Sequence, residues 1–277
     1  MEREPALAYY EGGPELTDVV LQALRAAGRQ VDPLDPDDLA GVDEFHGLGR
    51  AATLTMADLA GISEGERVID VGAGIGGPAR TLARHLGADV TALDPTSRFC
   101  GLNEELCRRS GLAERVRVIR GDARRIPVGD GEFDVAWTQA VWPSVDDKQA
   151  MLREVHRALG ERGRLAVYEV VHGPADGDLH YPVPWANGPA ESFVVSSDEM
   201  RRLAESAGFT VQEWLEGPEV VARIGGTASS GGPGIATGVD GVTLALLMPD
   251  FDDRMAGLAR NVREQRIGLV MAVFSKR

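Results

Sequence analysis

The chain of 277 residues is long enough for one α/β core of ordinary size together with smaller covering segments. Hydrophobic residues make up 43% of it and charged residues 26%, a composition typical of globular proteins and unlike that of disordered or fibrous chains. Twenty-nine Lys and Arg residues against 43 Asp and Glu residues give a net charge of −14, which repels phosphate backbones and anionic lipid surfaces. We therefore expect neither nucleic acid nor a membrane as a partner.

The cysteines and the apolar runs predict the cellular setting. Cys100 and Cys107 lie seven residues apart on one predicted helix with no further metal ligands nearby, so we expect buried core thiols and no metal site. The N-terminus, Met1–Pro5, is charged, and the apolar run at residues 242–248 is much shorter than the ~20 residues of a membrane span. These features predict a reduced, cytoplasmic protein.

In chain order, the first region is a covering segment. Residues 1–61 are predicted to be helical at Glu15–Ala27 and again at Gly47–Leu59, with an Asp- and Pro-rich turn at residues 31–38 between the two helices. We expect this region to form an N-terminal helical cap over the top of a sheet.

From residue 67 onward, short β-branched runs alternate with longer amphipathic stretches, a pattern typical of a sheet with helices on both faces. The predicted strands are residues 67–71, 89–93, 116–119, 133–137, 164–171, 209–215 and 268–274. The predicted helices are residues 77–86, 97–110, 148–159 and 198–207, the last with Ser197 as its N-cap.

A second covering segment interrupts this alternation between the last two strands. Residues 217–261 contain a glycine-rich stretch, an apolar run and a final helix that begins near Asp252. Gly225–Gly234 holds five glycines, two serines and a proline, which predicts a mobile loop and a lid hinge. The predicted boundaries are thus a cap at 1–61, a core at 62–216 and 262–277, and a cap insertion at 217–261.

The segment Val68–Ala79 carries the strongest chemical signal, because an apolar strand runs into glycines and then into a helix. Glycines allow a tight turn and a close approach to a ligand, and the helix N-terminus offers free N–H groups. Read as GxGxxG through Gly77, the loop is that of dinucleotide binders, with Asp94 for the ribose. Read as GxGxG through Gly76, it follows an acidic residue, Asp70.

Carboxylates further along the chain favour the second reading. S-adenosylmethionine presents an ammonium, two ribose hydroxyls and an adenine amino group, and charge-assisted contacts to such groups contribute about 1.5 to 3 kcal/mol each. Asp70 suits the ammonium, Asp94 the ribose and Asp122 the adenine amino group. Acidic residues at three successive strand ends are more than a dinucleotide fingerprint requires.

Together with the glycine segment, further motifs resemble the ordered motifs of class I S-adenosylmethionine-dependent methyltransferases, over about Arg67–Val171. They are Leu93-Asp-Pro, Gly121-Asp-Ala-Arg, Phe133-Asp-Val-Ala-Trp-Thr-Gln and Arg157-Ala-Leu-Gly-Glu-Arg-Gly-Arg-Leu. The flanking segments resemble the small-molecule branch that contains sarcosine/dimethylglycine and tocopherol methyltransferases. These segments are Tyr9-Tyr10, Phe45-His-Gly, Pro182-Val-Pro-Trp-Ala and Arg266-Ile-Gly-Leu-Val.

The resemblance implies an α/β fold with a Rossmann-like seven-stranded sheet, in the order 3-2-1-4-5-7-6 and with an antiparallel last strand. It implies S-adenosylmethionine as cofactor at the carboxyl ends of the strands. The residues expected to bind the cofactor are Tyr10, His46, Asp70, Gly72, Gly74, Asp94, Thr96, Asp122, Ala123 and Gln139.

Methyl transfer from a sulfonium is an in-line displacement, so the protein must chiefly align the reactants and exclude water. Aromatic residues expected to contact the acceptor are Tyr9, Trp142 and Trp185. Where the branch often has Met-Asn after the fourth strand, this chain has Trp142-Pro143-Ser144, so the acceptor side is expected to differ. The predicted catalytic residues are His172, His180 and Tyr181 as base or orienting groups, with Glu169 in the pocket or in an ion pair at the strand end.

The sequence thus predicts methyl transfer from S-adenosylmethionine to a small molecule, an aromatic or amine secondary metabolite, with C- or N-methylation favoured over O-methylation. Two alternatives stay open. One is a nicotinamide-dependent oxidoreductase built on the same glycine loop, and the other is a subunit that binds the cofactor without catalysis. A homodimer is also left open.

Overall fold

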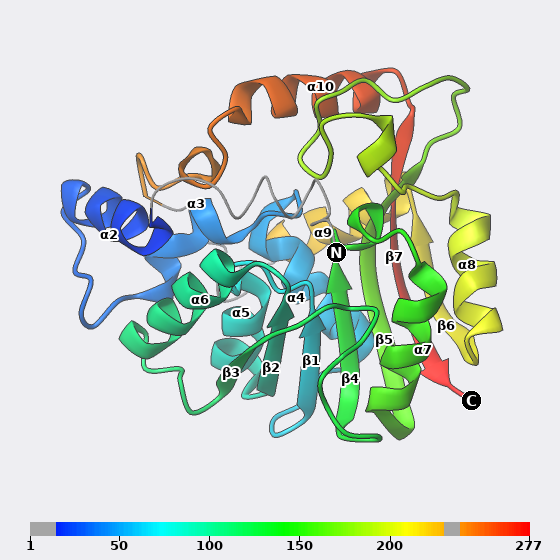
Figure 1. Ribbon diagram of the computed structural model, residues 1–277, viewed down its shortest axis with the longest axis horizontal. Coiled ribbons are helices and arrows are strands. Elements are labelled where there is room, and N and C mark those ends of the chain that lie inside the picture. The colour runs from blue at the N-terminus through cyan, green and yellow to red at the C-terminus, as the bar shows by residue number, and fades with distance from the viewer. Residues whose placement is uncertain (1–14, 230–238) are drawn as a thin grey trace.

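The computed structural model describes residues 15–229 and 239–277. Its core is a seven-stranded sheet in the order β3-β2-β1-β4-β5-β7-β6, which confirms the predicted fold class (Figure 1). Strands β1 to β5 run parallel, and β7 pairs antiparallel with both β5 and β6. The strands are β1 Arg67–Val71, β2 Asp89–Asp94, β3 Val116–Arg120, β4 Phe133–Gln139, β5 Leu159–His172, β6 Phe209–Glu216 and β7 Ile267–Lys276.

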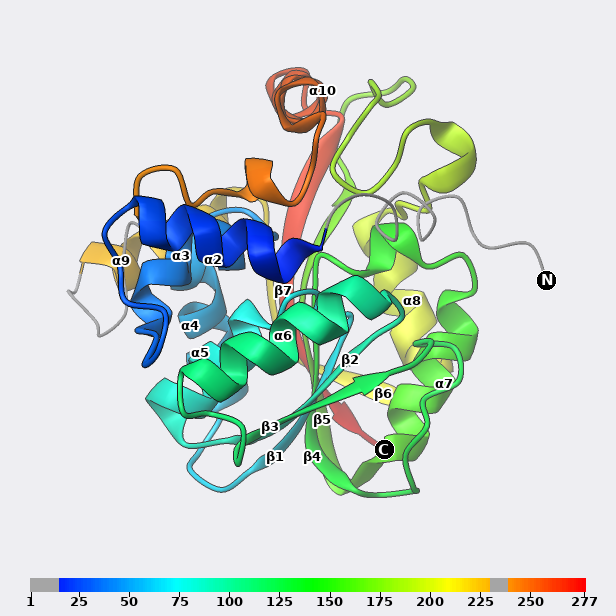
Figure 2. The same ribbon diagram turned by 60° about the vertical axis from the view of Figure 1, so that its left-hand side comes forward.

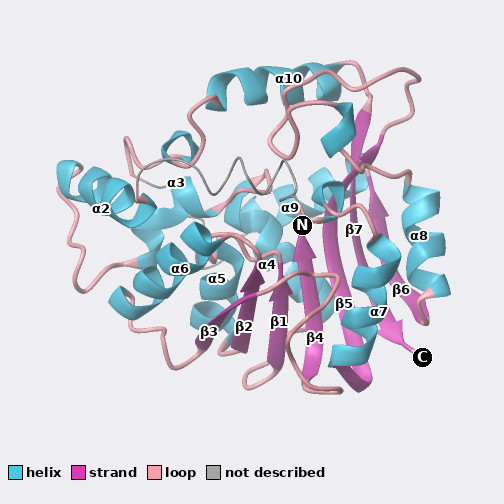
Figure 3. Cartoon of the chain, in the orientation of Figure 1, coloured by secondary structure: helices cyan, strands magenta, loops and turns pink. Residues whose placement is uncertain are grey.

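Helices cover both faces of this sheet and its upper edge (Figure 3). The helices are α2 Leu16–Ala26, α3 Ala40–Asp43, α4 Gly49–Ala60, α5 Gly77–Leu86, α6 Ser97–Arg109, α7 Lys148–Ala158, α8 Ser197–Ser206, α9 Pro218–Ser229 and α10 Phe251–Arg263. Short 3-10 turns are formed by Pro36–Leu39, Trp142–Ser144, Pro189–Glu191 and Leu244–Leu246.

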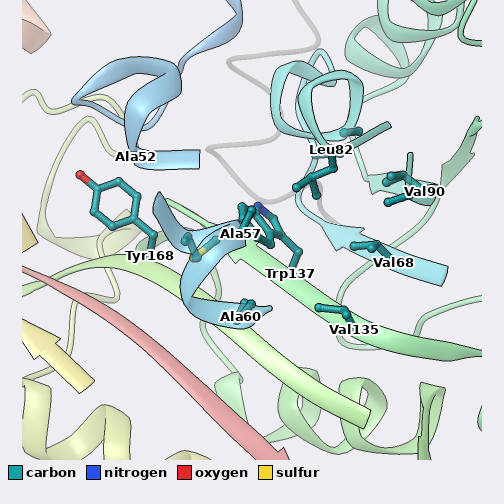
Figure 4. Packing of buried hydrophobic residues seen from close by; sticks show 14 of the residues in the cluster. Ala52, Ala57, Ala60, Val68, Leu82, Val90, Val135, Trp137 and Tyr168 are labelled. Atoms are coloured by element: carbon teal, nitrogen blue, oxygen red, sulfur yellow. The ribbon is translucent and has the colours of Figure 1, made fainter. Parts of the chain in front are cut away.

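The strands divide their side chains between two cores because successive strand residues point to opposite faces. Val68, Val135 and Trp137 pack with α4, α5 and α9 on one face, as Figure 4 shows for part of this cluster. Ile69 and Ala136 pack with α7 and α8 on the other face. Both faces are therefore apolar, as expected of a mainly parallel sheet that is buried on both sides.

The N-terminal region and part of the segment before α10 pack together over α6 (Figure 2). The apolar stripe of α2 includes Val20 and Leu24, which share a buried cluster with Leu106 of α6. Val242 belongs to the same cluster, and so does Ile75 from the turn between β1 and α5. The covering segments thus reach the glycines that follow the first strand.

A second covering unit lies above the carboxyl ends of the strands, where Figure 1 places α10. We call residues 173–196 together with α10 the upper cap. Buried Arg254 of α10 donates hydrogen bonds to the Val183 carbonyl, at 2.6 Å, and to Asn187 Oδ1. Buried Asn261 of α10 donates to the His180 carbonyl at 2.9 Å. These bonds tie the helix to a loop some 70 residues earlier in the chain.

Two local predictions are wrong. Residues 225–229, expected to belong to a mobile loop, are the end of helix α9, because Val220 and Ile224 lie one turn apart and are buried against the core. The rest of that expected loop, residues 230–234, lies outside the described residues. The N-cap of α8 is Ser196, not Ser197, since its side chain accepts a hydrogen bond from the Glu199 N–H.

Cys100 and Cys107 are both buried, as predicted for core thiols. Of the helices in residues 15–229 and 239–277, none combines the length and the hydropathy that a bilayer crossing requires.

Candidate cofactor and acceptor site

The turn between β1 and α5, residues 72–77, is called the glycine loop here. Gly72, Gly74 and Gly76 all have positive φ angles, of 82°, 56° and 85°, which favour glycine. A Cβ atom on Gly72 would overlap the side chain of Val141, and one on Gly76 would overlap Asn103. At Gly74 such an atom would meet no other described residue within 4 Å, so within residues 15–229 and 239–277 the loop is packed at its two ends and uncrowded at its centre.

Asp70, in the strand just before this loop, is buried without compensation. Its side chain is 1% exposed, and Oδ2 has no hydrogen-bond partner among the described residues. Burial, together with the charge of Asp94, raises the pKa of Asp70 to about 8. A buried carboxyl of this kind is destabilising unless a donor or a cation reaches it. The position therefore fits the ammonium of the expected cofactor.

Asp94, at the end of β2, is held rigidly beside the glycine loop. Its two carboxylate oxygens accept hydrogen bonds from the Gly74 N–H and the Thr96 N–H, each at 2.8 Å. These two bonds orient the carboxylate beside the glycine loop, and a carboxylate is an acceptor that suits the hydroxyls of a ribose. Thr96 contributes through its backbone and is itself buried.

Asp122, in the turn after β3, has a partner that the sequence did not predict. It accepts hydrogen bonds from the backbone N–H and the guanidinium of Arg124, and Arg124 also pairs with Asp146 at 2.7 Å. The hydrogen bonds from Arg124 hold the pKa of Asp122 below its usual value, so the carboxylate is charged. Its role toward adenine, with neighbouring Ala123, stays a prediction.

Gln139, the last residue of β4, joins a polar chain above the strand ends. Its Oε1 accepts from the Trp137 indole at 3.1 Å and from the Thr53 hydroxyl at 3.3 Å. Thr53 Oγ1 lies 3.3 Å from His46 Nε2, which is 2.8 Å from Glu44 Oε2. Gln139 and His46, predicted as cofactor residues from distant parts of the chain, are thus joined through Thr53.

Glu44 anchors the outer end of this chain of hydrogen bonds. Burial alone would raise the pKa of Glu44, but hydrogen bonds and charges from His46 and Arg50 hold it below its usual value. Arg50 in turn pairs with Asp37 at 2.6 Å. Glu44 and Thr53 were missed in the sequence, where the only available signal was their closeness to the Phe45-His-Gly motif.

On the acceptor side, Glu169 of β5 is fully enclosed and forms no ion pair with any residue that the structure describes. Its Oε2 accepts hydrogen bonds from the backbone N–H groups of Val141, at 2.9 Å, and Trp142, at 3.1 Å. Burial raises the pKa of Glu169 to about 8, although these hydrogen bonds oppose the rise. Glu169 therefore fixes the turn after β4, whose Val141 side chain also packs against Gly72.

Trp142 and Trp185 were both predicted to contact the acceptor, and both are largely enclosed. Trp142 is 1% exposed, packs in the core of the α7 face and donates to the Thr138 hydroxyl at 3.1 Å. It is a core residue in this structure. Trp185 lies in the upper cap, is 9% exposed and donates to the Ser192 hydroxyl at 2.9 Å.

The predicted bases do not share one environment. His172 is exposed at the end of β5, on the opposite face from Glu169, as the alternation along a strand predicts. His180 lies in the upper cap, where Nε2 is 2.7 Å from Glu264 Oε2. Tyr181 packs beside the apolar cluster of that cap. Tyr9 and Tyr10 lie outside the described residues.

Tyr168 is a further buried polar residue on this side that the sequence did not indicate. It pairs in register with Gln139, and its ring lies edge-on to the His46 ring at 6.1 Å. Its hydroxyl is buried without a partner among the described residues, and Figure 4 shows it directed away from Trp137. Burial raises the pKa of Tyr168, so the phenol keeps its proton and is a hydrogen-bond donor.

Part of the chain is similar to a known protein family. Residues 69–167, which run from within β1 through the glycine loop and β2 to β4 into β5, match the family described as "Methyltransferase domain". The chain contains a methyltransferase domain. The family expected from the motifs is confirmed over this segment.

Relatives of the methyltransferase domain extend the match in part. The chain is 31% identical over 163 residues to methyltransferase GfsG of Streptomyces halstedii. The aligned segment covers 59% of this chain and 56% of that protein. The chain is 37% identical over 121 residues to the glycine/sarcosine/dimethylglycine N-methyltransferase of Actinopolyspora halophila. Here the aligned segment covers 43% of this chain and 21% of that protein. The chain thus spans about half of the first relative and a fifth of the second.

The whole described fold also has a solved counterpart. The geranyl diphosphate C-methyltransferase of Streptomyces coelicolor A3(2), crystallised with S-adenosyl-L-homocysteine, has a TM-score of 0.66 and covers 99% of this chain and 98% of its own. At 16% identity, this likeness concerns the arrangement of the elements. That arrangement includes the covering segments as well as the methyltransferase domain.

Proposed function

We propose that the protein transfers a methyl group from S-adenosylmethionine to a small-molecule acceptor. The observation that carries this proposal is Asp70, a buried carboxyl whose Oδ2 has no hydrogen-bond partner in the part of the chain that the structure describes. It lies beside a glycine loop in which none of the described residues crowds Gly74. Asp94, oriented by two backbone N–H groups, stands at the next strand end. A nicotinamide dinucleotide would use the glycine loop and Asp94 but has no ammonium for Asp70.

Different residues contact different parts of the cofactor. Asp70 receives the ammonium, Asp94 accepts from the ribose hydroxyls, and Asp122 with Ala123 holds the adenine edge. Gln139 and His46 lie toward the methionine end, linked through Thr53. When bound, S-adenosylmethionine supplies an electrophilic methyl group on a sulfonium. Alignment of the acceptor with that methyl group can lower the barrier by ~7 to 11 kcal/mol.

For the acceptor, we favour an aromatic or amine secondary metabolite methylated on carbon or nitrogen. The net charge of −14 favours neutral or cationic acceptors over polyanionic ones. Two of the similar proteins are consistent with either atom, since one is named as an N-methyltransferase and the other as a C-methyltransferase. We place the acceptor between the strand ends of β4 and β5 and the upper cap, which holds Trp185.

The base that removes a proton from the acceptor is proposed among His172, His180 and Tyr181, with Glu169 as an orienting group. Glu169 performs that orientation by holding the turn at Val141 and Trp142. A general base typically contributes 10² to 10⁴ in rate. Loss of the base should therefore slow transfer by that factor and leave cofactor affinity unchanged.

The test is formation of S-adenosylhomocysteine in the presence of a panel of aromatic, amine and olefinic acceptors. The proposal expects turnover with at least one class, and a 10² to 10⁴-fold loss in one of His172→Ala, His180→Ala or Tyr181→Phe. The alternative of a cofactor-binding subunit expects binding of S-adenosylmethionine with no turnover by any variant.

A further inference from the structure

Arg80 of α5 is a fully buried arginine that contacts three separate segments. Its side chain is 1% exposed. Nη1 donates to the Ile75 carbonyl at 2.7 Å and to Asn103 Oδ1 at 2.9 Å. Nη2 donates to Asp43 Oδ1 at 2.6 Å. One guanidinium thus joins the glycine loop, helix α6 and the N-terminal region.

The same three segments are in tight contact at the second half of the glycine loop. A Cβ atom on Gly76 would overlap the Asn103 side chain, and one on Gly77 would overlap the backbone of Asp43. Asn103 and Asp43 therefore sit directly against the loop whose shape they help to fix. Any shift of Asp43 away from the loop would also withdraw the partner of the Arg80 charge.

Asp43 belongs to a segment with its own packing. We call residues 15–48 the docking segment. Its helix α2 packs on α6, and its Leu39 and Val42 lie in the cluster that contains Ile75. Asp43 and Arg80 side chains are each 1% exposed, so the pair has no water to replace either partner. Separating a buried pair strands a charge and is strongly unfavourable.

The pair is charged in neutral solution. Burial raises the pKa of Asp43 to about 6, and the Arg80 guanidinium opposes that rise. At pH 7 the Asp43 carboxylate and Arg80 therefore attract each other. In contrast, the neighbouring pair Arg84 and Asp35, one turn further along α5, is 35% and 57% exposed. The Arg84–Asp35 pair also joins α5 to the N-terminal region, but water can reach both side chains.

We propose that Arg80 is a positioning residue that couples the docking segment to the glycine loop, so that docking of residues 15–48 and binding at the loop favour each other. The ligand at the loop is the cofactor of the proposed function, on which this part of the inference rests. Because coupling free energies are reciprocal, a ligand on the glycine loop must stabilise the docking segment as much as docking strengthens ligand binding.

The experiment compares wild type, Asp43→Asn and the matched control Asp35→Asn by amide hydrogen exchange and by calorimetric titration with S-adenosylhomocysteine. In the free protein, Asp43→Asn should speed exchange in residues 72–77 by about ten-fold, and Asp35→Asn should leave it unchanged. In wild type, S-adenosylhomocysteine should slow exchange across residues 15–48. Asp43→Asn should weaken its binding about ten-fold and abolish that protection.

A second variant keeps the test decisive if Asp43→Asn does not fold. Asn103→Ala removes one contact of Arg80 without stranding a charge. It should speed exchange in residues 72–77 and, to a smaller extent, in residues 15–48, because the coupling is reciprocal.

Unchanged exchange at residues 72–77 in both Asp43→Asn and Asn103→Ala would overturn the inference, and so would binding by wild type without protection of residues 15–48. If wild type binds no S-adenosylhomocysteine, the proposed function fails. The exchange of the free protein then still reports whether Asp43 and Arg80 hold the loop.

Discussion

Asp70 beside the glycine loop differs in its hydrogen bonding from the buried polar residues of the upper cap, Arg254 and Asn261. Asp70 is enclosed, and its Oδ2 finds no hydrogen-bond partner among the residues that the structure describes. In the cap, buried Arg254 and Asn261 are matched by carbonyl and amide partners from the facing loop. An uncompensated buried carboxyl is costly in the free protein, and so points to a ligand. A buried arginine with hydrogen-bond partners for its guanidinium, such as Arg254, points to a role in stabilising the fold.

The comparison predicts that substitutions at the loop change ligand affinity, whereas substitutions within the cap change stability. The largest effect on affinity is expected for Asp94→Ala. It removes the ribose acceptor and frees the Gly74 and Thr96 N–H groups, so binding of S-adenosylhomocysteine should weaken by ~10²-fold or more. Calorimetric titration measures this loss.

The control for that substitution lies on the same strand. Asp89→Ala, at the opposite end of β2, removes an exposed side chain that pairs with Arg115 and should leave the affinity unchanged. Normal binding by Asp94→Ala would show that the ribose assignment is wrong.

The next largest effect is expected in the upper cap. Arg254→Met removes hydrogen bonds to Val183 and Asn187 and the ion pair to Asp250 at 2.9 Å. We expect the free energy of unfolding to fall by about 3 kcal/mol while the affinity for S-adenosylhomocysteine stays within about two-fold. Chemical denaturation and calorimetry measure the two quantities.

Arg260→Met is the matched control on α10, since its side chain is 54% exposed and it should leave stability almost unchanged. A large loss of affinity in Arg254→Met would contradict the prediction that substitutions within the cap change stability and not ligand binding.

Asp70→Asn should have a smaller effect, about ten-fold on affinity, and should change the pH dependence of both stability and binding. The pKa of Asp70 is raised to about 8, so the folded protein favours its protonated form. Its contribution to stability is present at low pH and is lost as pH rises from about 4 through 8. Asp70→Asn should therefore flatten that decline in thermal unfolding.

The affinity for the ligand depends on pH in the opposite direction to stability. A ligand ammonium favours the ionised carboxylate, so S-adenosylhomocysteine should release a proton on binding at pH 7 in wild type. Calorimetry in buffers of different ionisation enthalpy measures that release, and an equal release by Asp70→Asn would assign the proton to another group.

The smallest effect is expected for Tyr168→Phe, which removes the unpartnered buried hydroxyl on the acceptor side. The free protein should be unchanged or more stable by about 1 kcal/mol, and affinity for S-adenosylhomocysteine should stay the same. Thermal unfolding and calorimetry test this. A clear loss of affinity would instead place the Tyr168 hydroxyl on the cofactor.

The sequence predicted the loop half well because its signals are local. Strand β1 and helix α5 have the predicted bounds, since the apolar run, the glycines and the helical periodicity follow one another directly. Helix α9 was missed because glycines at 225 and 226 outweighed the buried Val220 and Ile224 in the pattern.

The cap half could not be predicted because its decisive contacts join distant residues. His180 meets Glu264 across 84 positions, and Arg254 donates to the Val183 carbonyl across 71 positions. No local periodicity reports such partners. The sequence therefore identified candidate acceptor residues by type and left their environments undetermined.

The most direct test of the account is parallel calorimetric titration of the purified protein with S-adenosylmethionine, S-adenosylhomocysteine and NAD. We expect micromolar binding of the first two and none of NAD, because only the first two bring an ammonium to Asp70. Binding of NAD alone, or of none of the three, would contradict the proposed function.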